Sequence, residues 1–151
     1  MAAQPHGGSL INCLLSETEA AQWRELAPTL PAITLTRREL LDLSLLGTGA
    51  FSPLSGYMSR ADYQAVVETM HLADGTAWSM PIVLATSAER AATLREGQTI
   101  LLQDVLGMPW GLLELRERYP YDRAREARLV YRTEDLAHPG VAALYEQGDV
   151  L

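Results

Sequence analysis

The chain has 151 residues, of which 48% are hydrophobic and 21% are charged, values that fit one folded domain with its own core. Its formal net charge is −7, from 12 basic and 19 acidic residues, which argues against a general nucleic-acid-binding protein. Every basic residue is arginine, so a Walker-type phosphate lysine and a Schiff-base lysine are both excluded.

Membrane and secretory features are also missing from the sequence. No apolar stretch approaches the roughly 20 residues that a membrane-spanning helix needs. The first residues carry no positive charge ahead of an apolar core, as a signal peptide would. Cys13 is the single cysteine, so an internal disulfide is excluded. We therefore expect a cytoplasmic protein that does not associate with membranes.

The first half of the chain predicts helices. Residues 1–12 have no regular pattern and are expected to form a loose or extended arm. The capping boxes Ser16–Glu19 and Thr36–Glu39 predict the starts of two helices, separated by a short strand at 33–35. Gly47 is predicted to end the second helix. A third helix is expected after Ser59, which can cap it.

The second half changes to short β-type runs. Strands are predicted at 81–85, 99–103 and 110–119, and helices at 87–94 and 139–147. Residues 121–130 are ambiguous, because arginine and alanine favour a helix while the end of the segment favours a strand. This order predicts an α+β fold with a small barrel-like sheet.

A loop rich in glycine and proline, residues 45–63, stands out. Gly47-Thr48-Gly49 begins like a dinucleotide-binding fingerprint, but Ser52 occupies the position of the third glycine. The preceding segment is also predicted to be a helix, whereas the fingerprint follows a strand. We therefore favour a tight turn, in which Pro53 fixes one φ angle, over an anion-binding nest.

The residues that carry chemistry do not form a recognisable catalytic pattern. The three histidines are dispersed and have no metal-ligand spacing. Ser55 precedes Gly56, but no acid and histidine can be assigned to it, so a turn is the better interpretation. From the residues alone, the chain is an α+β domain without an assignable reaction.

Several segments nevertheless carry a family resemblance, in the family's order and at roughly its spacing. The chain resembles the N-terminal domain of ATP sulfurylase, also called sulfate adenylyltransferase, over nearly its whole length. The segments that carry the resemblance are PHGG at 5–8, LLGTGAFSPLSGYMSRADY at 45–63, LADGTAW at 72–78, PIVL at 81–84 and HPGV at 138–141.

The resemblance implies a single PUA-like domain over residues 1–151, a small β pseudo-barrel with flanking helices. The family joins ATP and sulfate into adenosine 5′-phosphosulfate and pyrophosphate, with magnesium accompanying the nucleotide. Its catalytic residues lie in the following adenylyltransferase domain, in a Gln-x-Arg-Asn run and an H-x-x-H motif that position the phosphates. Neither motif occurs in this sequence, so that domain is expected to be absent and no catalytic, cofactor-binding or metal-binding residue is carried over.

The sequence departs from the family at four positions: Ser55 stands for the usual Asp, Tyr57 for Phe, Ser79 for Pro, and Arg132 for Gly. We expect a structural role in which the domain docks on a catalytic domain, in the same chain or in a separate one. The candidate docking residues come from the arm and the glycine-rich loop: they are His6, Gly7, Gly8, Gly47, Gly49, Phe51, Pro53, Gly56 and Tyr57.

Two alternatives differ from this interpretation. The chain could be a free-standing PUA-like module for a small ligand or RNA, although a net charge of −7 opposes RNA binding. It could instead regulate a separate catalytic chain, in which case exposed apolar surface predicts self-association.

Overall fold

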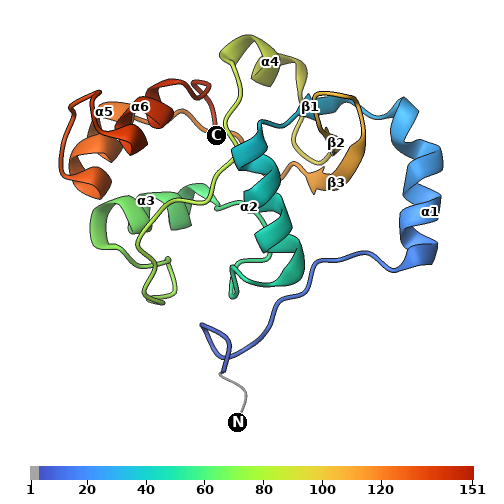
Figure 1. Cartoon of the computed structure of the whole chain (residues 1–151), viewed down its shortest axis with the longest axis horizontal. Coiled ribbons are helices and arrows are strands. Elements are labelled where there is room, and N and C mark those ends of the chain that lie inside the picture. Colours follow the sequence, from blue (N-terminus) through green and yellow to red (C-terminus); the bar gives the residue numbers. More distant parts are fainter. Residues whose placement is uncertain (1–3) are drawn as a thin grey trace. The chain divides into compact units, whose positions relative to one another are not determined.

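A computed structural model describes residues 4–151 as a mixture of helices and short strands (Figure 1). The helical elements in this part of the chain are α1 (Glu17–Leu26), η1 (Ala27–Thr29), α2 (Arg37–Thr48), α3 (Arg60–Thr69), α4 (Ala88–Thr93), α5 (Arg123–Glu126), η2 (Ala127–Tyr131) and α6 (Pro139–Tyr145). The strands are β1 (Ala32–Thr34), β2 (Thr99–Gln103) and β3 (Pro109–Glu114). None of the helices among these residues combines the length and apolarity that crossing a bilayer requires.

The elements gather into two compact units. The first contains the described residues up to Gly56 together with Arg95–Arg116, and the second contains Tyr57–Leu94 and Glu117–Leu151. The sheet, α1 and α2 therefore belong to the first unit. The second unit contains the helices α3, α4, α5, η2 and α6.

The predicted capping boxes form in the first unit. The backbone N–H of Ser16 donates to the Glu19 carboxylate at 2.9 Å, and that of Thr36 donates to Glu39 at 2.7 Å. In return, each hydroxyl accepts a bond from the backbone N–H three residues later. These contacts satisfy N–H groups that have no partner inside the helix, which is why both helices start where the sequence predicts.

The predicted end of the second helix is wrong by two residues. Gly47 lies inside α2, and its carbonyl accepts a hydrogen bond from the N–H of Cys13 at 2.9 Å. The residue in the left-handed conformation is Gly49, with φ at 80°. A partner from the arm thus satisfies one of the last carbonyls of the helix, and the chain turns at the second glycine.

The sheet has the order β1-β2-β3, with β1 parallel and β3 antiparallel to β2. Ile100 and Leu102 on the central strand are fully buried and form part of the core of this unit. In the described residues the sheet is open at both edges, whereas the sequence predicts a pseudo-barrel. β3 ends at Glu114, five residues before the predicted strand end.

The predicted strand at 81–85 is also wrong. These residues have no regular structure, and their hydrogen bonds go elsewhere: the carbonyl of Ile82 accepts the N–H of Met58 at 2.9 Å. Pro81 has no N–H to donate to a ladder. The run is apolar because Ile82 is buried, which is a consequence of packing and does not require a strand.

The turn between β2 and β3 is fixed by the side chain of Asp104. One carboxylate oxygen accepts the backbone N–H groups of Leu106 and Met108 at 2.8 and 2.9 Å. The other accepts the indole N–H of Trp110 at 3.1 Å. The bond from Trp110, together with these backbone bonds, lowers the pKa of the Asp104 carboxyl below its ordinary value.

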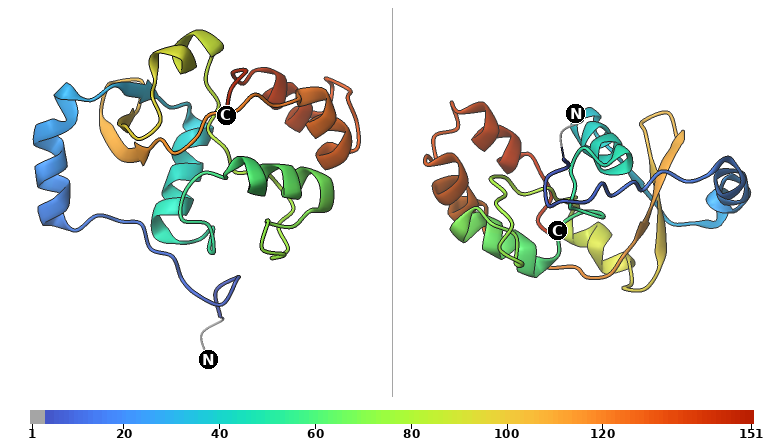
Figure 2. Two further views of the ribbon diagram at one scale, coloured as in Figure 1. Left: turned by 180° about the vertical axis from the view of Figure 1, so that it is seen from behind. Right: turned by 90° about the horizontal axis from the view of Figure 1, so that it is seen from below.

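In the second unit, α3 packs beside η2, and α6 also contacts η2 (Figure 2). The Tyr63 hydroxyl of α3 donates to the buried carboxylate of Glu126 at 2.8 Å. Burial, and then the neighbouring Glu126 charge, raise the pKa of Tyr63. The ambiguous segment after Tyr121 is helical, and its end forms the π-type turn η2 where a strand was the alternative.

Arg132 closes this helical segment in a conformation that favours glycine. Its φ is 60°, in the left-handed region, where a Cβ atom costs energy. The resemblance to the family implies a glycine at this position. The structure therefore gives that departure a physical cost.

We expect Arg132→Gly to raise the free energy of unfolding by about 0.5–1 kcal/mol, because glycine relieves the backbone strain but loses more entropy on folding. Chemical denaturation would measure the change. Arg132→Ala is the matched control: it removes the same charge but keeps Cβ, and should give no gain. An equal gain from both variants would show that the charge is responsible and not the backbone.

The hydrogen bonds of Asp104 should be lost in acid. Because its pKa is lower in the folded chain, their contribution is complete above the ordinary Asp pKa of about 3.9 and disappears as the pH falls through the folded value. In a ¹H–¹⁵N spectrum, the indole N–H signal of Trp110 should therefore move only at pH values below the ordinary Asp pKa of about 3.9. The Trp78 indole donates to the carbonyl of Met80 at 2.8 Å and should not follow this titration.

Candidate functional site

The arm and the glycine-rich loop meet in the first unit and form one surface, which we call the docking corner: residues 4–14 and 45–56. In Figure 1 the arm, drawn in dark blue, runs from α1 towards the lower end of α2. The predicted arm covers residues 1–12, of which 1–3 lie outside the described residues. The described part has no helix or strand, yet specific contacts hold it to the loop.

The central contact of the docking corner is made by the hydroxyl of Ser52, a residue that is 2% exposed. It accepts the backbone N–H of Ile11 at 2.9 Å and donates to the carbonyl of Gly49 at 2.6 Å. One buried hydroxyl thus satisfies a donor of the arm and an acceptor of the loop. The Gly49 carbonyl also accepts the Ser52 backbone N–H at 3.0 Å, so loss of the hydroxyl would cost free energy mainly at the Ile11 N–H.

Two glycines let the backbones approach each other. A Cβ atom on Gly49 would come within 2.6 Å of the Ile11 carbonyl oxygen, and its φ of 80° already disfavours side chains. A Cβ atom on Gly7 would come within 2.8 Å of the Pro53 ring. The close approach of the arm therefore gives Gly7 of the PHGG segment and Gly49 of the loop a physical reason.

The docking corner presents an apolar surface without charge. Its two segments contain no Asp, Glu or Arg, although 21% of the chain is charged. Leu10 and Leu14 on the arm are 61% and 63% exposed, and Leu45 at the end of α2 is 38% exposed. Depletion of charge and exposure of apolar side chains are features of protein–protein interface cores.

The structure brings together most of the candidate docking residues. His6, Gly7 and Gly8 are exposed on the arm, while Phe51 and Pro53 are half-buried in the loop. Two further glycines of the set, Gly47 and Gly49, lie at the end of α2 and are described above. Gly56 closes the loop, and a Cβ atom there would meet nothing within 4 Å.

One candidate falls outside this surface, and one important residue was missed. Tyr57 begins the second compact unit and is not part of the docking corner. Ser52 was noted only as an interruption of the glycine pattern. No sequence signal identifies its role, because its partner Ile11 lies 41 residues away in the chain.

The chemistry of the docking corner suits binding of an apolar surface. His6 and Cys13 are its titratable side chains, and its two segments contain no Asp or Glu. Among residues 4–151, His, Cys, Asp and Glu side chains form no cluster of three or more that could hold a metal ion.

Comparisons with known proteins identify the family of this chain. Residues 3–151 match the family model of the PUA-like domain. A sulfate adenylyltransferase of Synechococcus sp. (strain JA-3-3Ab) is 52% identical over 149 residues, which are 99% of this chain and 38% of that protein. A sulfate adenylyltransferase of Desulforamulus reducens is 40% identical, with 97% and 38% covered.

A solved structure is also similar. The hexameric APS kinase from Thiobacillus denitrificans superposes with a TM-score of 0.68 at 34% sequence identity, covering 78% of this chain and 24% of that one. This chain belongs to the PUA-like domain family. More particularly, it matches the N-terminal PUA-like part of sulfate adenylyltransferases and spans about 38% of their length, so their catalytic region is not covered.

Ser52→Ala should lower the free energy of unfolding by about 1–3 kcal/mol, because it removes the hydroxyl that accepts the part-buried N–H of Ile11 and donates to the Gly49 carbonyl. Hydrogen exchange at the Ile11 amide should accelerate at the same time. Ser55→Ala, in the same loop but exposed, is the control and should stay within about 0.5 kcal/mol of the parent. Unchanged protection at Ile11 would contradict the bridging role of Ser52.

Proposed function

We propose that this chain is a non-catalytic docking domain of a sulfate adenylyltransferase, and that the docking corner contacts the catalytic domain, in the same chain or in a separate one. The observation that carries the proposal is the match of 99% of the chain to the N-terminal 38% of a sulfate adenylyltransferase at 52% identity. In this proposal the PUA-like domain supplies a docking surface, and the reaction of Mg-ATP with sulfate takes place in the partner domain.

The geometry of the docking corner supports a binding role. Its arm is already held in place by the Ser52 hydroxyl and by close contacts at Gly49 and Gly7. A surface that is ordered before binding loses less entropy when a partner arrives. The absence of charged side chains in both segments also removes the cost of desolvating ions in the contact.

The proposal separates a docking role from catalysis. The chain by itself is expected to make no adenosine 5′-phosphosulfate from ATP, sulfate and magnesium. Its effect on the reaction should come through the stability and orientation of the catalytic domain. Phosphosulfate and pyrophosphate formed by the purified chain alone would overturn this assignment.

A chimera tests the docking corner directly. This chain would replace the matched N-terminal part of the Synechococcus enzyme, and Gly56→Arg would be introduced, because an added side chain there meets no neighbour within 4 Å. The variant should destabilise the chimera by about 1–2 kcal/mol and lower pyrophosphate release, while the isolated chain stays within about 0.5 kcal/mol. Thermal unfolding and a pyrophosphate assay would measure both effects.

The matched control is Ala92→Arg on the exposed side of α4, which adds the same side chain away from the docking corner. It should leave stability and activity of the chimera unchanged. A Gly56→Arg chimera that is as stable and as active as its parent would show that the catalytic domain docks elsewhere.

A further inference from the structure

A pocket of about 320 Å³ lies in the second unit, between α3 and the segment that leads into α5. Its most buried lining residues are Tyr63, Val67 and Tyr119, each at most 6% exposed. The half-buried Tyr121 also lines it, and exposed polar residues such as Gln64 lie at its mouth. A pocket of this size with an apolar floor and a few polar groups is typical of a site for a small molecule.

The three tyrosine rings of the pocket are held in place by their hydroxyl groups. The Tyr63 hydroxyl has the buried carboxylate partner described above. Tyr119 donates to the carbonyl of Met58 at 2.9 Å, and Tyr121 donates to that of Gly148 at 2.8 Å. Burial, the largest cause in each case, raises the pKa of all three hydroxyls, so the rings stay uncharged. The rings are thus fixed before a ligand arrives, which lowers the entropic cost of binding.

The orientation of the rings selects the shape of the ligand. The plane of the Tyr63 ring makes an angle of 44° with that of Tyr119 and 88° with that of Tyr121, at centroid distances of 5.8 and 6.0 Å. A flat heterocycle stacks on a parallel ring, so it can lie against only one of these planes. A compact, rounded group touches several ring faces at once, as the methyl groups of a quaternary ammonium ion do in aromatic cages.

The charge at the pocket favours a cation. Asp122 lines the pocket, and its carboxylate accepts the backbone N–H of Arg125 at 3.0 Å. Within residues 4–151 no salt bridge joins the Asp122 carboxylate to a basic side chain. The guanidinium of Arg125, the basic group in the lining, is paired with Glu68. The unbalanced carboxylate and the net charge of −7 therefore attract a positively charged ligand.

Two of the rings already attract cations of the chain itself. The guanidinium carbon of Arg60 lies 5.4 Å from the ring centroid of Tyr119, and that of Arg123 lies 5.8 Å from the ring centroid of Tyr121. Both distances are within the roughly 6 Å over which a ring face attracts a cation. Neither arginine lines the pocket, so neither guanidinium occupies it.

We propose that this pocket binds a quaternary or methylated ammonium group of the size of choline, with the three tyrosine rings around its methyl groups and the carboxylate of Asp122 as its counter-charge. Free solutes such as choline and the headgroup of phosphatidylcholine share this chemistry. The pocket uses no residue of the docking corner, so the proposal stands independently of the proposed function.

An NMR titration of the whole chain with choline tests the site, and about 10 mM choline is enough to reveal a millimolar Kd. We expect saturable shifts of the Gln64 and Asp122 amide signals and intermolecular NOEs from the N-methyl protons to the tyrosine rings. The uncharged isostere 3,3-dimethylbutan-1-ol has the same shape and should bind about tenfold more weakly. The absence of saturable shifts with choline, or equal binding of the isostere, overturns the proposal.

Two variants of Tyr121 separate the aromatic ring from the hydroxyl. Tyr121→Leu should weaken choline binding about three- to tenfold, because leucine is apolar but has no aromatic face. Tyr121→Phe is the matched control: it loses the same hydrogen bond to Gly148 but keeps the ring, and should bind like the parent. If both variants bind choline equally well, the ring does not recognise the cation and the proposal is wrong.

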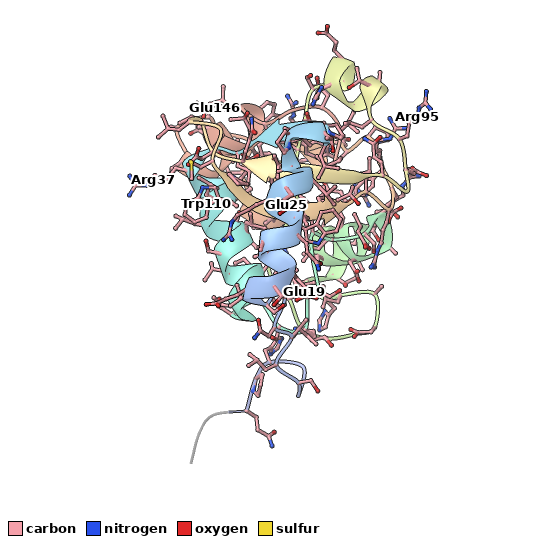
Figure 3. All side chains as sticks on the ribbon, turned by 90° about the vertical axis from the view of Figure 1, so that its right-hand side faces the viewer. Glu19, Glu25, Arg37, Arg95, Trp110 and Glu146 are labelled. Atoms are coloured by element: carbon pink, nitrogen blue, oxygen red, sulfur yellow. The ribbon has the colours of Figure 1, made fainter. Side chains whose placement is uncertain are left out.

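Two further variants test the counter-charge and the location. Asp122→Asn should weaken choline binding about threefold or more by removing the charge, while asparagine still caps α5. Trp110, labelled in Figure 3, is an aromatic ring of the first unit that is 56% exposed. Trp110→Leu should leave choline binding unchanged, and an equal loss in this variant would mean general adsorption to exposed rings and would overturn the assigned pocket.

Co-sedimentation with phosphatidylcholine vesicles separates the two sources of the ligand. A chain that sediments with the vesicles and is released by choline recognises the lipid headgroup. A chain that binds choline and stays in the supernatant recognises the free solute. Vesicle binding that choline does not reverse would contradict the pocket as the recognition site. Because the docking corner takes no part in these measurements, their failure leaves the proposed function untouched.

Discussion

The hydroxyl of Ser52 joins two segments of the first unit that lie 41 residues apart in the chain. It holds the Ile11 N–H of the arm and the Gly49 carbonyl of the loop at the same time. The close approach is possible only because Gly49 has no side chain to strike the Ile11 carbonyl. This constraint turns a segment without helix or strand into part of an ordered surface, and the docking corner depends on it.

The first unit carries two apolar surfaces that are built in different ways. The docking corner is held by a buried hydroxyl and by backbone approach at glycine. The exposed turn between β2 and β3 is held by the carboxylate of Asp104, which accepts hydrogen bonds from donors of the same turn. Both are fixed before any partner binds, which lowers the entropic cost of a contact at either surface.

The sequence predicts where the helices start, but it does not predict how the strands are arranged. Ser16 and Glu19 are three residues apart, so the bonds between them need only local geometry. The apolar run at 81–85 looks like a strand by composition, but strand formation needs a neighbour with free donors and acceptors. The structure gives Ile82 a different partner, the N–H of Met58. In the contact between the arm and the loop, the glycines stand out in the sequence, whereas Ser52 has no sequence signal.

The sequence by itself determined the helix starts, the glycine-rich loop and the membership of the PUA-like family, because each depends on residue types at short, fixed spacings. Only the tertiary structure decided that α2 ends at Gly49 and not at Gly47, since a donor from Cys13 satisfies the carbonyl of Gly47. It also decided that the arm is held to the loop and that Val105 and Leu106 in the turn between β2 and β3 are exposed. These features depend on partners far away in the chain, and no local pattern records such a partner.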